Sequence, residues 1–159
     1  MRRRAGRQYA VQLLFQRDYH HDMDIAAGFR DFWADNRTDS KTLAFAEALV
    51  IGVINNLPHI DELITKSADN WDLMRIGGVE RNAMRLATYE MLMCHDIPPV
   101  VSINEAVDLT KSMCDERAGK FVNGILDRIQ RDIGRPLRTG TPRGRSAATD
   151  TPPSDSDHS

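Results

Sequence analysis

Apolar residues recur along most of the chain at the spacing of a helical turn. One stripe consists of Leu43, Ala46, Val50, Val53, Ile54 and Leu57, a second of Ile103, Ala106, Val107, Thr110 and Met113, and a third of Phe121, Val122, Ile125, Leu126, Ile129 and Ile133. A period near 3.6 is typical of amphipathic α-helices. Residues 79–93 are apolar on most sides, which predicts a central, buried helix. No stretch alternates as a strand would. The pattern predicts an all-α bundle of about seven helices.

Local signals place several helix starts. Ser102 and Glu105 form a capping box just after two prolines, which predicts a helix beginning at Ser102. Asp24 can cap a helix over residues 25–34, and Asp39 or Ser40 can cap the next.

The C-terminal segment has a different composition. It holds four of the seven prolines and many Ser, Thr and Arg residues, and no large apolar residue follows Leu137. Such a segment buries too little surface to offset its ordering entropy. We therefore expect a helical domain over residues 1–134 and a disordered tail over residues 135–159.

Charge is distributed unevenly along the 159 residues, whose net charge is −2. Residues 1–17 carry five arginines and no acid, whereas residues 18–133 carry 12 basic and 20 acidic side chains. A basic end on an acidic body predicts a polyanionic partner. The two cysteines fit a reducing compartment, and the chain shows neither a secretory signal nor a membrane-spanning run, so we expect a cytoplasmic protein.

The candidate binding residues begin with the arginine cluster Arg2, Arg3, Arg4 and Arg7, directly before an apolar helical pattern. These cations lie at the positive end of the helix dipole, which is unfavourable, and a bound phosphate would offset that repulsion. The alternative is a frayed, solvated terminus, and the two interpretations carry similar weight.

Two further groups allow two interpretations each. Arg81 and Arg85, with Glu80 beside them, form either a solvated edge or an internal ion pair. Phe121, after Lys120, is either a core residue or a platform on which a base stacks.

Motifs for catalysis or metal binding are missing from the sequence. There is no phosphate loop, dinucleotide fingerprint or His-Glu-x-x-His motif. The adjacent His20 and His21 would point about 100° apart on a helix, which disfavours a metal site. We expect no enzyme activity, no cofactor and no metal.

The assembled motifs resemble those of the bacterial NusB family, from about Arg3 to Ile133. The most specific run is Val79-Glu80-Arg81…Arg85-Leu86-Ala87…Tyr89-Glu90, followed by Ile97-Pro98…Val101-Ser102-Ile103-Asn104-Glu105-Ala106-Val107 and Lys120-Phe121-Val122-Asn123-Gly124-Ile125-Leu126-Asp127. In this order, after an arginine-rich start, the motifs form a specific signature.

This resemblance implies two packed helical subdomains and a factor without catalysis or cofactor. Family members bind the single-stranded boxA element of nascent RNA, typically as a heterodimer with the ribosomal protein NusE. The complex helps RNA polymerase read through terminators, notably in ribosomal RNA operons. Carried over by position, the RNA-binding residues would be Arg2, Arg3, Arg4, Arg7, Arg85, Lys120 and Phe121, and the partner-binding residues Phe15 and Glu80.

Two other functions stay open at this point. The chain could be a detached RNA-binding domain that serves an RNA cytosine methyltransferase, since NusB-like domains also occur fused to such enzymes. Alternatively, it could be a helical scaffold that forms a homodimer and masks its own arginine cluster.

Overall fold

The computed structural model describes residues 1–138, and all regular secondary structure in this range is helical. It contains α1 (Arg3–Tyr19), α2 (Ile25–Asp35), α3 (Ser40–Asn55), α4 (Leu57–Ser67), the short 3₁₀ helix η1 (Leu73–Arg75), α5 (Gly78–Met93), α6 (Pro99–Met113) and α7 (Glu116–Ile133). The prediction of an all-α protein with about seven helices is confirmed within these residues. The part of the expected disordered tail that starts at residue 139 lies outside them.

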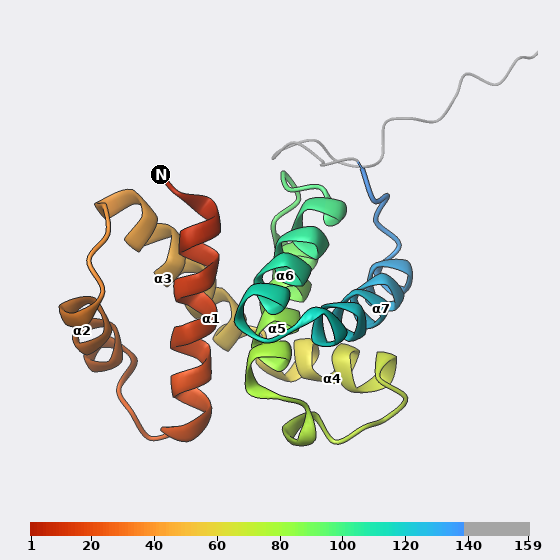
Figure 1. Cartoon of the computed structure of the whole chain (residues 1–159), viewed down its shortest axis with the longest axis horizontal. Coiled ribbons are helices and arrows are strands. Elements are labelled where there is room, and N and C mark those ends of the chain that lie inside the picture. The colour runs from red at the N-terminus through yellow and green to blue at the C-terminus, as the bar shows by residue number, and fades with distance from the viewer. Residues whose placement is uncertain (139–159) are drawn as a thin grey trace, which may run out of the picture.

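The helices form two packed groups, and α5 of the second group packs against the first (Figure 1). Helices α1, α2 and α3 make one group, and α4 to α7 make the other. Helix α5 contacts α1 and α3 on one side and α4, α6 and α7 on the other. Every residue from Arg81 to Thr88 is buried. The prediction of a central buried helix is therefore confirmed.

No single helix in residues 1–138 is long and apolar enough to cross a membrane. Only α3 and α4 taken together, with a bend of 76° between them, meet the criteria of length and composition.

Capping explains where several helices begin. The Asp24 carboxylate accepts from the Ala26 N–H, and the Asp39 carboxylate accepts from the Thr42 N–H at 3.0 Å, as predicted for both aspartates. The predicted start of α6 is wrong, because this helix begins at Pro99. Proline suits the first helical turn, where its missing N–H costs nothing. Ser102 is instead buried inside α6, and its hydroxyl donates to Glu90.

The folded body extends past the boundary expected after residue 134. Arg135 donates hydrogen bonds to the carbonyl oxygens of Met91, His95 and Ile97, and the Leu137 carbonyl accepts from the Val100 N–H at 2.9 Å. The carbonyls at the end of a helix lack partners within the helix, and the guanidinium of Arg135 supplies donors for this region. Apolar content alone could not reveal this polar attachment.

Candidate nucleic-acid interface

The exposed part of the arginine cluster consists of Arg2, Arg3 and Arg4, at the start of α1. The backbone N–H of Arg2 donates to the Thr42 hydroxyl at 2.9 Å, and the Arg3 guanidinium lies 5.8 Å from the centre of the Phe45 ring. A Cβ atom at Gly6 would stand 2.6 Å from that ring. Glycine therefore permits the close approach of α1 to α3 that holds these arginines in place.

Arg4 is already paired with carboxylates of α6. Its Nε and Nη2 atoms each lie 3.0 Å from an oxygen of Glu105, and Nη2 also lies 3.1 Å from Asp108. The Arg4 side chain nevertheless remains 67% exposed. A phosphate can therefore reach this guanidinium, in competition with two carboxylates.

Arg7, although predicted to bind RNA, is only 4% exposed. Its guanidinium forms a bidentate ion pair with the buried Glu90, with Nη2 to Oε1 at 2.7 Å and Nε to Oε2 at 3.0 Å. Burial alone would lower the pKa of Arg7, but its hydrogen bonds to Glu90 and the charges of nearby carboxylates together raise the pKa above its usual value. Arg7 therefore holds α1 against α5, and the exposed cluster ends at Arg4.

Arg85 also lies in the interior, within a network centred on Asp18. Asp18 accepts from Arg81 at 2.9 Å, from Asn82 at 2.8 Å and from Arg85 at 2.8 Å, and Arg85 also binds Asp61. Burial raises the pKa of Asp18, but the hydrogen bonds from Asn82 and the two arginines outweigh burial and hold the pKa below its usual value. The internal ion pair is the interpretation of Arg81 and Arg85 that the structure confirms.

Lys120 and Phe121 are both exposed near the start of α7. Phe121 is 38% exposed, whereas Val122, Ile125, Leu126 and Ile129 of the same stripe are buried. The ring therefore lies at the edge of the core. Trp71 and Arg128 line the same surface hollow as Lys120 and Phe121. Sequence reasoning missed both residues, because neither belongs to a periodic stripe or a charged run.

Phe15 and Glu80 lie beside the N-terminal end of α5. The half-exposed Phe15 ring covers Gly78, where an added Cβ would stand 2.4 Å from the ring, and a Glu80 oxygen accepts from the Cys114 thiol at 3.0 Å. Burial and this hydrogen bond raise the pKa of Cys114 to about 11. The structure thus brings an exposed aromatic ring and an oriented carboxylate to one end of a helix.

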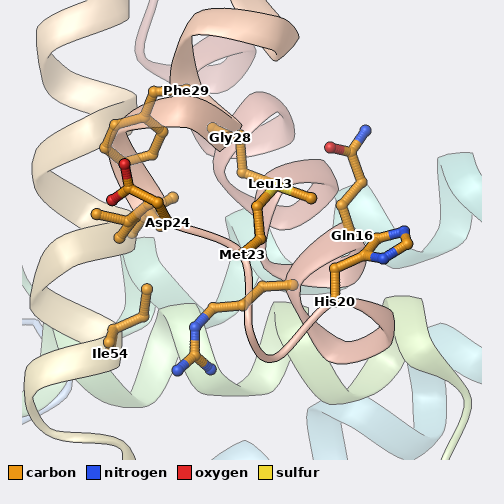
Figure 2. Close-up of a pocket in the computed structure, with 11 residues that line it drawn as sticks. Leu13, Gln16, His20, Met23, Asp24, Gly28, Phe29 and Ile54 are labelled. Carbon is orange, nitrogen blue, oxygen red and sulfur yellow. The ribbon is translucent and has the colours of Figure 1, made fainter.

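A small cavity lies elsewhere, between α1, α2 and α3 (Figure 2). Leu13, Met23, Phe29 and Ile54 point into it, and His20 stands at its edge. Its volume of about 40 Å³ is far below that of a typical ligand pocket. None of the residues predicted to bind RNA or a partner lines it.

Comparisons with known proteins agree with this arrangement. The model of the NusB family matches residues 4–131. The transcription antitermination protein NusB of Bacillus velezensis is 46% identical over 133 residues, which cover 84% of this chain and 98% of the relative. A structure of T. maritima NusB superposes with a TM-score of 0.74 at 36% identity, covering 89% of this chain and 94% of the other.

A second solved structure is a crystal structure of the antitermination factors NusB and NusE in complex with dsRNA. The matched chain has a TM-score of 0.74 at 30% identity, covering 82% of this chain and 96% of the other.

Proposed function

Because the chain belongs to the NusB family, we propose that it binds boxA-type RNA together with the ribosomal protein NusE and promotes read-through by RNA polymerase. It is an RNA-binding transcription antitermination factor and not an enzyme. The observation that carries the proposal is the exposed cluster Arg2, Arg3 and Arg4, held on an otherwise acidic body. Such a factor acts in the cytoplasm, where nascent RNA is made.

The RNA surface that we propose contains only the exposed members of the predicted set: Arg2, Arg3, Arg4, Lys120 and Phe121. Arg7 and Arg85 serve as internal supports, since their guanidiniums are bound to buried or half-buried carboxylates. Guanidiniums on α1 would neutralise phosphates, which supplies most sequence-independent affinity for nucleic acid.

Transcription past a terminator downstream of a boxA element tests this function. Adding the chain with the ribosomal protein should increase the fraction of transcripts that extend beyond the terminator. Read-through that stays at the level of polymerase alone, or that rises equally on a template with a scrambled boxA, would contradict the proposal.

The partner surface is tested by reversing one charge. NusE, as an RNA-binding ribosomal protein, is expected to be basic, so Glu80→Lys should weaken the heterodimer by roughly tenfold through lost charge complementarity. RNA binding by the isolated chain should stay equal or become slightly stronger. Calorimetry with the ribosomal protein measures the first effect. Glu62→Lys, which makes the same charge change at an exposed position of α4, is the control. Equal partner affinities for wild type and Glu80→Lys would place the partner surface elsewhere.

The carboxylates that hold Arg4 should compete with RNA. Removing one charge by Glu105→Gln should strengthen RNA binding about two- to fivefold at low salt, because an exposed ion pair of this kind is worth less than about 1 kcal/mol. Fluorescence anisotropy with labelled RNA measures the change. Glu62→Gln makes the same change in net charge without touching Arg4 and should have a smaller effect. If both variants bind RNA more tightly by the same factor, the cause is general repulsion between the acidic body and RNA, and not competition for Arg4.

A further inference from the structure

We propose that Trp71 and Phe121 form a stacking platform for the bases of single-stranded RNA, with Lys120 and Arg128 beside it to bind the flanking phosphates. This inference rests on the proposed function and extends the RNA surface to the loop between α4 and η1. Trp71 is 60% exposed and Phe121 is 38% exposed. Their ring centres lie 6.5 Å apart with an angle of 46° between the planes, so the rings are not stacked face to face on each other.

The backbone before Trp71 is held in an unusual conformation. Asp69 and Asn70 have φ values of 54° and 60°, in the left-handed region that costs non-glycine residues energy. The loop is nevertheless ordered, since the Asn70 N–H donates to the Thr65 carbonyl and the Trp71 N–H donates to the Ala68 carbonyl. These bonds hold a large aromatic side chain at the surface, although burial would stabilise the fold more.

Gly124 leaves one side of the platform open. This residue follows Phe121 by one helical turn in α7, and a Cβ atom there would have nothing within 4 Å. Glycine lowers the stability of a helix relative to alanine, and here no packing contact requires it. Its missing side chain helps to form a hollow of about 320 Å³ between α7 and the Trp71 loop. That volume lies at the low end of small-ligand pockets.

The charges around the hollow favour RNA over a protein partner. Lys120 and Arg128 both line it and are exposed. Arg128 is anchored by a hydrogen bond of 2.9 Å to the Ser67 carbonyl, while Asp69 lies 3.6 Å away. Aromatic faces that accept bases, next to cations that follow the backbone, are the usual elements of single-strand binding. Lys120 and Phe121 also make the platform continuous with the proposed RNA surface.

Fluorescence of the full chain tests the platform directly. The sequence has two tryptophans, and Trp33→Phe leaves Trp71 as the only one. Titration of this variant with a boxA RNA should quench the Trp71 emission as a base stacks on the ring. Trp71→Ala should weaken RNA binding about 5- to 150-fold, the range found for the loss of one stacked base, whereas Trp71→Phe should retain most of the affinity.

A second variant separates binding from folding. Gly124→Leu fills the hollow with a better helix former, so RNA binding should weaken while the melting temperature stays equal or rises. Trp71→Ala with unchanged RNA affinity, or no quenching of Trp71 by bound RNA, would overturn the platform. Trp71→Ala that weakens binding of the ribosomal protein but not of RNA would overturn it in favour of a protein-docking surface.

Failure of the proposed function gives a different result. If a scrambled RNA binds as tightly as boxA RNA and both quench Trp71 equally, the platform stands and the boxA function fails. If boxA RNA is preferred without quenching of Trp71, the function stands and the platform is overturned.

Discussion

Replacing Asp18 by alanine is expected to lower the free energy of unfolding by about 3–5 kcal/mol, the cost of removing one partner from a buried ion pair. Asp18 accepts hydrogen bonds from Arg81, Asn82 and Arg85, and all four residues are buried. Without the carboxylate, Arg81 loses its only ion-pair partner among the described residues, while Arg85 keeps Asp61. Urea denaturation followed by circular dichroism measures the loss.

The control for this prediction is Asp31→Ala, which removes an exposed carboxylate from α2 and should change stability by less than about 0.5 kcal/mol. A similar small change for Asp18→Ala would show that the network does not stabilise the fold.

The stability difference between wild type and Asp18→Ala should also depend on pH. Because the pKa of Asp18 is held below its usual value, its contribution to stability is present above about pH 4 and is lost as the pH falls through the lowered pKa. The difference in stability between wild type and Asp18→Ala should therefore be constant from pH 7 to pH 5 and shrink in stronger acid. A difference that shrinks between pH 7 and pH 5 would contradict the lowered pKa.

The double variant Arg3→Ala, Arg4→Ala is expected to weaken RNA binding by at least about tenfold to a hundredfold, since even one hydrogen bond to a charged group contributes about 1.5–3 kcal/mol. If each arginine neutralises one phosphate of a single strand, the log–log salt slope should fall by about 1.4. Anisotropy titrations at several salt concentrations measure both quantities. The melting temperature should change little, because the ion pairs of Arg4 are exposed.

Arg7→Ala is the matched comparison for this double variant. It removes an arginine from the same helix, but leaves Glu90 as a buried carboxylate without its ion-pair partner, so the main effect should be lost stability. Unchanged RNA affinity and salt slope in the double variant would exclude the exposed cluster as the RNA-binding surface.

The helices could be predicted from the sequence because their packing leaves a periodic trace. The stripe from Val122 to Ile129 is buried as its spacing requires, and the burial of α5 follows from its central position. The start of α6 could not be placed in this way. Ser102 matches a capping pattern, but its hydroxyl binds Glu90 on a neighbouring helix.

The site was harder to predict, because helical spacing shows which residues share a face but not what lies opposite. Arg7 and Arg4 both precede the apolar pattern of α1. Arg7 nevertheless forms an ion pair with Glu90, 83 positions away in the sequence, and is buried. Trp71 had no signal at all, since it stands in a loop whose position depends on two left-handed residues. Exposure of each cation and each aromatic ring is therefore what the structure adds.

The most direct measurement is the binding of labelled boxA RNA, compared with a scrambled RNA of equal composition, in the presence of the ribosomal protein. Run at two salt concentrations, the titration separates sequence preference from phosphate attraction. A boxA-binding antitermination factor should bind the boxA RNA at least about tenfold more tightly than the scrambled RNA, corresponding to about 1.4 kcal/mol, at both salt concentrations. Equal affinities for the two RNAs would contradict the proposed function.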